Sequence, residues 1–589
     1  MVDYIADYLE NIRERRVYPD VQPGYMHKLL PKEAPFAPEK WDDIFKDVER
    51  VIMPGLVHWQ SPHTHAYFPA LTSYPSIMGE MLSSALNVLC FTWASSPAGT
   101  ELETISMNWL GKVLGLPDCF LNEENDSTGG GVIQTTASEA TLVSLLAART
   151  RALMELAKLN PERQSSELLG HLICYCSDQA HSSVEKAGLI GLVRMRYIES
   201  DGNQSMRGDK LEEAIVADKA KGLVPFWVCA TLGTTGSVAF DNLKEIGKVC
   251  EKYSSWLHVD AAYAGSAFVC PEFRHWLEGV ELADSFAFNP SKWLMVNFDC
   301  TAMWVKDSTA LHRTFNHWQI PLSRRFRALK LWFVLRNFGV SGIQKHIRES
   351  VRLAQKFEAL VLADARFEIP QARNLGMVVF RLKGDNILTE RLLKKLNARG
   401  NIHSVPACFK GVYVIRFTVT SQRTTNQDIL DDWNEIKTVA SEILIDVFGT
   451  DNGNITASKI RRTKVSLKET RELNPTFGTS LLLANSPMSP KIVNGTHAAI
   501  CDYEQLLTSC AQTFAQLKME LKDSPEMRRR VRGMKMCGKK FSLDSCMDMV
   551  QGLMVEQSGS QTLAQWSEDE REDMASNGLR HLINIFLTS

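Results

Sequence analysis

The sequence predicts an α/β protein in which a large unit with a mostly parallel sheet precedes a smaller α/β unit. Strand-like and helix-like runs alternate from about residue 71 to residue 365, a pattern typical of a parallel sheet covered by helices. Three apolar runs, residues 172–176, 256–260 and 284–288, each lead to polar or ionisable side chains. Because the ends of parallel strands meet at one edge of a sheet, these side chains are candidates for a common site.

The first 70 residues predict a helical arm. The apolar positions that follow a helical period are Val2, Ile5, Ala6, Leu9 and Ile12. Five prolines follow between Pro19 and Pro38. A segment of this size has too little apolar surface for its own core, so we expect it to pack on something larger.

Three histidines, His58, His63 and His65, come close together at the end of this arm. Metal ligation must be considered for such a group. No cysteine or carboxylate joins them, and the segment is rich in aromatic residues that pack. We therefore predict no metal site.

A glycine run at residues 129–131 precedes a long helical pattern that begins near Ala137 and Ser138. Glycines before a helix let backbone amides approach a phosphate, and the helix dipole favours the anion. Ser138 has two open readings, as a phosphate ligand or as an ordinary N-cap. These readings do not exclude each other.

Three ionisable residues, His181, Asp260 and Lys292, follow the three apolar runs in that order. A lysine after Asn289-Pro290, which should end the strand with a turn, can be a surface residue, but a desolvated lysine amine is a nucleophile for carbonyl groups. A buried carboxylate needs a cationic partner. Pyridoxal phosphate offers such a partner in its ring nitrogen, and its enzymes also use a lysine. The three residues together are far more specific than any one of them.

The smaller unit is predicted from residue 366 to residue 449. Residues 367–369, 375–382 and 413–420 are strand-like, and residues 389–397 and 426–447 are helix-like. Beyond it, Asn, Ser, Thr and Pro become common, and basic clusters appear at residues 459–464 and 528–532. Residues 450–589 are therefore predicted to be a low-order tail, whose basic clusters are solvated.

Composition describes an ordinary soluble protein. The 589 residues are 44% hydrophobic and 23% charged, with a net charge of −2. This balance gives no reason to expect nucleic acid or a membrane surface as a partner, and no apolar run reaches membrane-spanning length. Thirteen cysteines, an odd number, indicate reduced thiols in the cytoplasm.

The motifs at residues 179–188, 258–265 and 288–293 resemble the group II pyridoxal-phosphate-dependent amino acid decarboxylases. The resemblance runs from Met1 to about Phe448. It implies the fold type I architecture, with a large cofactor-binding domain at residues 71–365 and a small C-terminal domain at residues 366–449. It also implies a homodimer in which the arm, residues 1–70, wraps around the second copy.

The resemblance assigns roles to particular residues. Lys292 would hold the cofactor, Asp260 would keep its ring nitrogen protonated, and His181 would stack on its ring and contact the substrate carboxylate. The expected cofactor-binding residues are Ala137, Ser138, His181, Thr235, Asp260, Ala262, Asn289, Ser291 and Lys292. The expected substrate-binding residues are Tyr67, His181, Leu89, Phe91 and Ser323. Plain core packing remains an alternative for Leu89 and Phe91.

Within the family, the resemblance favours L-histidine as substrate, with histamine and CO2 as products. Ser291, Ser323 and the run at residues 416–422 are closer to the branch that acts on histidine. A hydroxyl at Ser323, where the aromatic branch carries glycine, narrows the pocket and can bond an imidazole. Aromatic L-amino acid decarboxylation is the alternative.

One departure from the family pattern falls between Phe315 and Asn316. The family carries a mobile loop there, with a tyrosine that helps to protonate the carbon left by CO2. No tyrosine occurs between Tyr263 and Tyr413. The alternative of another class is therefore a dimeric protein that binds pyridoxal phosphate but turns over poorly.

Overall fold

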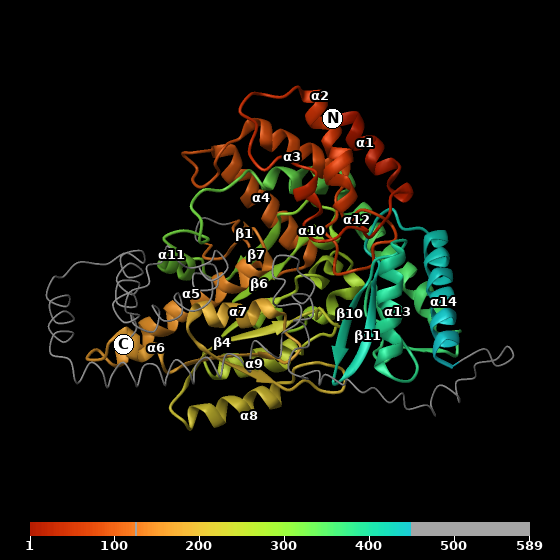
Figure 1. Ribbon diagram of the computed structural model, residues 1–589. Helices are drawn as coiled ribbons and strands as arrows, with labels where there is room; N and C mark the ends of the chain where they lie inside the picture. Colours follow the sequence, from red (N-terminus) through yellow and green to blue (C-terminus); the bar gives the residue numbers. More distant parts are fainter. Residues whose placement is uncertain (124–126, 449–589) are drawn as a thin grey trace, which may run out of the picture. The chain divides into compact units, whose positions relative to one another are not determined.

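A seven-stranded sheet forms the centre of the computed structural model, which describes residues 1–123 and 127–448 (Figure 1). The strands, in spatial order, are β1 (Gly130–Gln134), β7 (Thr301–Val305), β6 (Ser285–Phe288), β5 (Trp256–Asp260), β4 (Val224–Thr231), β2 (Leu172–Ser177) and β3 (Arg194–Ile198). Every pair from β6 to β3 is parallel, and β7 runs antiparallel to both β1 and β6. The predicted mostly parallel α/β sheet is confirmed.

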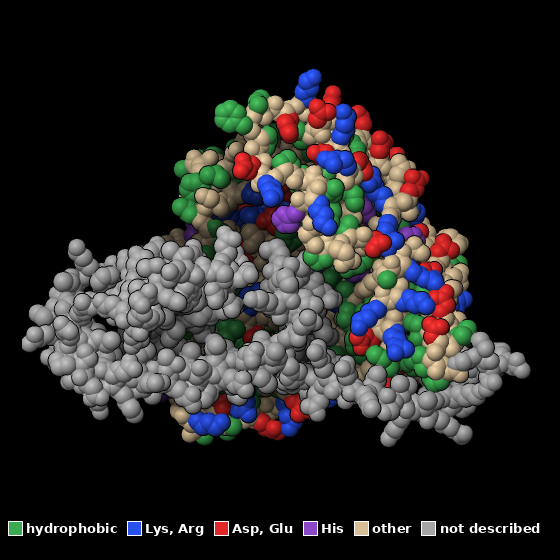
Figure 2. Space-filling model, viewed as in Figure 1, with side chains coloured by type: hydrophobic (Ala, Val, Ile, Leu, Met, Phe, Trp, Pro, Cys, Tyr) green, Lys and Arg blue, Asp and Glu red, His purple; other side chains and the backbone are tan. Residues whose placement is uncertain are grey.

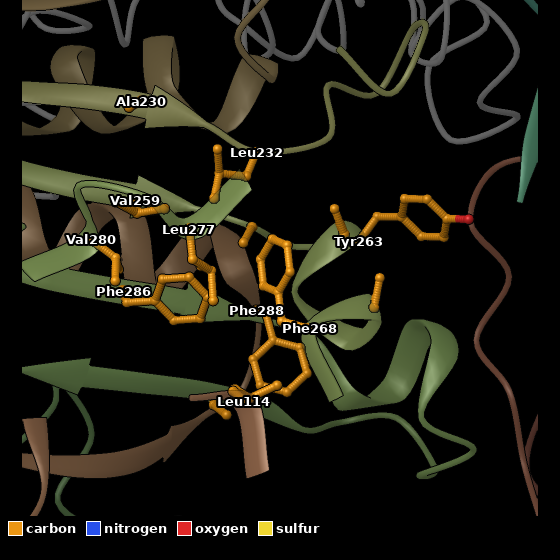
Figure 3. Close-up of a cluster of buried hydrophobic side chains, with 14 of the residues drawn as sticks. Leu114, Ala230, Leu232, Val259, Tyr263, Phe268, Leu277, Val280, Phe286 and Phe288 are labelled. Carbon is orange, nitrogen blue, oxygen red and sulfur yellow. The ribbon is translucent and has the colours of Figure 1, made fainter. Parts of the chain in front are cut away.

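Helices cover both faces of this sheet because its strands are buried on both sides. In β4, Trp227 and Cys229 belong to the core beneath α5 (Ala137–Leu159), α7 (Ser182–Gly191) and α11 (Thr309–Phe315). The alternate residues Val228 and Ala230 face the core beneath α4 (Pro97–Leu114), α8 (Gly208–Lys219) and α9 (Leu243–Lys252). Figure 3 shows this second core, where Phe286 and Phe288 lie near Leu114. Parallel strands that helices cover on both faces have continuous apolar runs in their sequence.

A smaller antiparallel sheet follows, in the order β10 (Val405–Phe409), β11 (Val412–Thr418), β9 (Met377–Leu382) and β8 (Phe367–Glu368). It packs on α13 (Asn386–Arg399) and α14 (Asn426–Phe448) through an aromatic cluster that includes Phe357, Phe417 and Trp433. The sequence predicted all these elements except β10. Pro406 lowers the strand signal there, but an edge strand tolerates a proline because one of its sides makes no ladder hydrogen bonds.

The long helix α12 (Ala328–Leu362) joins the two sheets. Leu331 and Val334 pack in the core of the large sheet, and Leu353 and Phe357 pack in the core of the small one. The described residues all belong to one compact unit. The domain boundary near residue 365 therefore stays a prediction.

The N-terminal arm packs on the helices beside the small sheet of its own chain. It includes α1 (Val2–Glu10) and α2 (Trp41–Asp47). The Arg13 guanidinium pairs with Asp428 at 3.0 Å, and the Val17 amide donates to the Gly400 carbonyl at 2.8 Å. The wrapping of this arm around a second copy remains a prediction.

The histidines at the end of the arm bind protein groups. His63 Nδ1 lies 2.7 Å and His65 Nε2 lies 2.8 Å from the two carboxylate oxygens of Asp432. His58 Nδ1 lies 2.9 Å from the Tyr8 hydroxyl. The two bonds to Asp432 tether the arm to α14. Across the part of the chain that the structure describes, no group of three or more potential ligands is arranged to hold a metal ion.

Positive and negative side chains are interspersed on the described surface seen in Figure 2. Among the described helices, none is both long and apolar enough to span a membrane. The predicted tail, residues 450–589, lies outside the described residues.

Candidate active site

A cavity of about 240 Å³ opens at the carboxyl ends of the parallel strands. It lies where ligands bind in open α/β sheets. Its lining consists of Phe68, Thr136, Ala137, Ser138, His181, Ser183, Thr231, Gly233, Thr235, Asp260, Ala262, Tyr263, Asn289 and Lys292. The structure thus brings together every predicted cofactor-binding residue except Ser291.

Lys292 reaches the cavity from a one-turn helix. The sequence predicted a turn after the strand; instead, the short helix α10 (Pro290–Trp293) follows β6 directly, with Asn289 at its N-cap position. Pro290 fits the first position because its missing N–H has no helical partner there. Burial lowers the pKa of the Lys292 amine to about 8, partly opposed by the charge of Asp260. A lysine with a lowered pKa is a better nucleophile near neutral pH.

Asp260 ends β5 inside the protein, with 4% of its surface exposed. Its Oδ1 accepts a hydrogen bond from the Ala262 amide at 3.0 Å. Burial raises the pKa of this carboxyl, while the charge of Lys292 lowers it. A protonated ring nitrogen beside Asp260 would supply the further positive charge that this buried carboxylate needs.

His181 is held by the start of α7. The Ser183 amide donates to Nδ1 at 3.1 Å, so the proton of the neutral ring lies on Nε2. Burial lowers the pKa of His181 to about 4, and the charges of Lys292, Lys186 and Arg416 add to the effect. The ring therefore enters the site as a neutral hydrogen-bond donor.

The start of α5 forms the anion-binding end of the cavity. Thr136 is the N-cap, because its hydroxyl accepts the Glu139 amide at 3.1 Å. The reading of Ser138 as the N-cap is therefore wrong, and its hydroxyl remains available to a ligand. Ala137 and Ser138 both line the cavity at this helix N-terminus, which suits a phosphate.

The glycine run does not form the phosphate loop that the sequence suggested. Gly130 and Gly131 lie on β1, before the helix start. A Cβ on Gly131 would lie 2.6 Å from the Trp304 ring nitrogen, and one on Gly129 would lie 2.0 Å from the Cys119 carbonyl oxygen. These glycines allow close packing around β1.

Sequence reasoning missed an aromatic stack at the cavity. The Phe68 ring lies 3.9 Å from that of Tyr263, which lies 4.8 Å from that of Trp293. Tyr263 belongs to the buried core, and in Figure 3 its ring extends away from the other labelled side chains. Gly233 was also missed; it has φ +85°, and a Cβ there would lie 2.6 Å from Ala264 Cβ. In the sequence, the only sign of Phe68 and Tyr263 was that each is adjacent to a predicted site residue, Tyr67 and Ala262 respectively.

The predicted substrate residues Tyr67, Leu89, Phe91 and Ser323 do not line this cavity. The Tyr67 ring stacks on Trp59 at 5.5 Å, with φ +62°. Leu89 and Ser323 are exposed and Phe91 is half-buried. Their two segments meet, since the Cys90 amide donates to the Arg324 carbonyl at 2.9 Å. The predicted cofactor residue Ser291 is buried, and its carbonyl accepts the Leu71 amide at 2.9 Å. The binding roles of all five stay predictions.

These features define an enzyme of fold type I that uses pyridoxal phosphate: a lysine of lowered pKa, a buried carboxylate and a helix N-terminus share one cavity. The residues fit the cofactor, with Lys292 for its aldehyde, Asp260 for its ring nitrogen and the start of α5 for its phosphate. The family model of the pyridoxal-dependent decarboxylase conserved domain matches residues 23–383. The chain belongs to this family, and its cofactor is pyridoxal phosphate.

Individual relatives agree with this family. The chain is 64% identical to histidine decarboxylase of Drosophila melanogaster over 93% of its own length and 66% of that protein's length. It is 54% identical to aromatic-L-amino-acid decarboxylase of the same species, over 75% of this chain and 90% of that one. A crystal structure of Oryza sativa TDC with PLP and tryptamine superimposes with a TM-score of 0.73 at 37% identity, covering 75% of this chain and 96% of that one. The chain thus spans about two thirds of the first of these relatives.

Proposed function

We propose that this chain decarboxylates L-histidine, giving histamine and CO2. The observation that carries the proposal is that Lys292, Asp260 and His181 share one cavity in a chain 64% identical to a histidine decarboxylase. Bound pyridoxal phosphate supplies the electron sink for the electron pair released when CO2 leaves. The protein's residues bind and orient the reactants.

Each polar group of the cavity has a distinct task in this reaction. The Asp260 carboxylate holds a proton on the ring nitrogen, which strengthens the sink. The amides at the start of α5 and the Ser138 hydroxyl bind the phosphate. His181, neutral and protonated at Nε2, would be available to donate a hydrogen bond to the substrate and to contact the cofactor ring.

The choice of histidine over aromatic substrates rests on identity within one species. The chain is 64% identical to the Drosophila histidine decarboxylase and 54% identical to the Drosophila aromatic enzyme. The test supplies equal concentrations of histidine and DOPA to the purified protein with pyridoxal phosphate and quantifies both amines. We expect histamine to predominate. A predominance of dopamine would replace this proposal with aromatic decarboxylation.

The protein acts as a homodimer in this proposal. An apolar surface on α3 (Tyr74–Leu86) and the segment after it supports this assembly. Its exposed members are Tyr74, Met78, Met81, Leu82, Leu86, Leu89 and Trp93. Hydrophobic side chains are visible beside α3 and α4 at the upper left of Figure 2. A contiguous surface of this kind normally contacts another protein. A second copy would bring Leu89, Phe91 and Ser323 to a cavity that they do not reach in their own chain.

Sedimentation tests the dimer. Met78→Glu should produce monomers, because a carboxylate within the proposed contact would be buried without a partner. Leu159→Glu is the matched control, since Leu159 is also exposed but lies at the end of α5, outside this surface. Monomeric behaviour of the unmodified protein at micromolar concentration would contradict the assembly.

We further infer a cytoplasmic location. All nine cysteines in the described ranges are free thiols, and seven of them are buried. Such usage is typical of a reducing compartment.

A further inference from the structure

The hydroxyl of Ser183 lies buried at the wall of the active-site cavity. Ser183 is the second residue of α7, is 4% exposed and lines the cavity. Its Oγ lies 2.8 Å from His181 Nδ1, and its backbone amide donates to the same nitrogen at 3.1 Å. One residue therefore places both of its donor groups on one atom of the cavity histidine.

The amide determines the direction of the hydroxyl bond. A backbone N–H can only donate, so Nδ1 is the unprotonated nitrogen of the ring and accepts. A hydroxyl can either donate or accept, and beside an unprotonated nitrogen it must donate. The Ser183 hydroxyl therefore stabilises the form of His181 that carries its proton on Nε2.

The same nitrogen also caps a helix. His181 is the N-cap of α7, because its Nδ1 accepts the Ser183 amide. This position is usually taken by the side-chain oxygen of Ser, Thr, Asp or Asn. A proton on Nδ1 would break the cap, and the partial positive charge of a helix N-terminus disfavours an imidazolium. The start of α7 therefore favours the same protonation state of the ring.

The charged groups around His181 act differently from this directional bond. Its pKa is lowered to about 4 by burial first and then by the charges of Lys292, Lys186 and Arg416. The acidic residue that lines the same cavity is Asp260. A charge acts on the protonation of the whole ring, whereas a hydrogen bond acts on one of its two nitrogens. Selection between the two neutral forms therefore falls to Ser183.

We propose that Ser183 is a positioning residue whose hydroxyl keeps the proton of His181 on Nε2, the nitrogen available to the reactants. This inference rests on the proposed decarboxylation, in which His181 offers that N–H to the substrate. Without the hydroxyl, the ring would lose the shorter of its two bonds at Nδ1. A fraction of the protein would then carry the proton on Nδ1 and present a bare nitrogen to the substrate.

Nuclear magnetic resonance can observe the protonation of both ring nitrogens directly. Protein with nitrogen-15 in its histidine rings is studied without cofactor and with pyridoxal phosphate, and His181→Gln identifies the His181 signals. The variants are Ser183→Ala, Ser183→Thr and Ser183→Asp. Ser182→Ala is the matched control, because Ser182 precedes Ser183 in the first turn of α7 but does not line the cavity.

The wild-type ring should be neutral at pH 7 with its proton on Nε2. Ser183→Ala should weaken the preference for Nε2 by about 2- to 10-fold, the effect of one neutral hydrogen bond. Ser183→Thr should restore it, because threonine keeps the hydroxyl. Ser183→Asp should reverse it, because a carboxylate accepts a hydrogen bond and draws the proton to Nδ1. Ser182→Ala should match the wild type.

Histidine turnover provides a second measurement. For Ser183→Ala, kcat/KM should fall by about 2- to 10-fold. Its decline at acid pH should begin at a higher pH, because a bond to the neutral ring is lost and the pKa of His181 rises. A merely structural role for Ser183 would lower activity at every pH without moving this decline.

Unchanged His181 signals in Ser183→Ala, or an equal change in Ser182→Ala, would overturn the assignment. If the extra methyl group of Ser183→Thr prevents folding, Ser183→Asp carries the comparison, because an acidic residue suits the first turn of a helix. Failure of the proposed reaction is separately visible. The wild-type protein would then form no histamine, while the signals of the cofactor-free protein would still report the position of the proton.

Discussion

At the scale of single residues, burial sets the chemistry of the site. Lys292 has an ordinary side chain, but desolvation brings its pKa to about 8. The same effect brings the pKa of His181 to about 4 and raises that of Asp260. All three shifts favour the uncharged forms, and bound reactants then supply the charges that each group lacks.

Lys292 should capture pyridoxal phosphate at a lower pH than a surface lysine does. The rate of capture by the cofactor-free protein should rise through about pH 8, because the neutral amine is the nucleophile. The measurement is the growth of the yellow absorbance band between pH 6 and pH 10. Borohydride reduction and peptide mapping should place the adduct on Lys292. Lys292→Ala should lose the band and keep its fold; an adduct on another lysine would refute the assignment.

Ser323→Gly should shift substrate preference from histidine towards DOPA. The substitution enlarges the expected pocket and removes a hydroxyl that can bond the imidazole. A single pocket contact is worth about 1–3 kcal/mol of discrimination, or about 10- to 200-fold in relative kcat/KM. The experiment measures kcat/KM for both substrates in a protein with the family loop restored. An unchanged ratio would remove Ser323 from the substrate pocket.

At the scale of elements, the ends of strands and the starts of helices position the residues of the site. The end of the N-terminal arm contributes Phe68 to the cavity wall. Thr136 caps α5 and leaves Ser138 free, while Asn289 stands at the start of α10, the short helix that carries Lys292. The segment that carries Tyr67 and Phe68 is tethered to α14 by Asp432. This tether joins the wall of the cavity to the smaller sheet.

The His63–Asp432 bond should make stability depend on pH. The hydrogen bond and charge of Asp432 raise the pKa of His63 in the folded protein, although burial opposes them as the largest single effect. The resulting stabilisation is complete below the unfolded pKa of about 6.5 and is lost as pH rises through the raised folded value. A charged hydrogen bond contributes about 1.5–3 kcal/mol.

Urea unfolding at pH 6 and pH 9 measures this dependence. His63→Gln should lose stability mainly at pH 6, whereas His275→Gln, which changes an exposed histidine, should leave the pH dependence intact. An equal loss at both pH values for His63→Gln would show that packing, not charge, holds the tether.

At the scale of the whole molecule, the backbone is continuous across the position where the resemblance predicts a family loop. Helix α11 ends at Phe315, and Asn316 takes a left-handed conformation with φ +54°. The His317 Nε2 then donates to the Phe91 carbonyl at 2.7 Å. The residues that line the cofactor cavity lie outside this junction, so we expect binding not to depend on the loop.

Histidine should therefore bind to the protein, but histamine should form slowly. A positioned proton donor is typically worth about 10²- to 10⁴-fold in rate, and a lid excludes water and completes the site. The measurement compares histamine formation by this chain with that of a variant in which a family loop is inserted between Phe315 and Asn316. Equal rates would show that the loop is dispensable, and a large gain would locate the deficit at this junction.

The sequence alone determined the fold class and most of the cofactor site. Strand-length runs that end at Asp260 or are followed within a few residues by His181 and Lys292 are local patterns. Parallel strands necessarily bring their carboxyl ends to one edge of the sheet. Comparison with the family model then confirmed the class of enzyme. The spacing of apolar residues also predicted the first and last helices of the described chain. Apolar residues that recur at the helical period mark the face of a helix that is buried.

Only the tertiary structure decided the contacts between distant segments. The glycines at residues 129–131 look the same in sequence whether they cradle a phosphate or let Trp304 pack closely, and the contact with Trp304 decided the matter. Asp432 meets His63 and His65 from more than 360 positions away. Burial and pairing are properties of the folded surroundings, and a one-dimensional pattern contains them only where the partners are local.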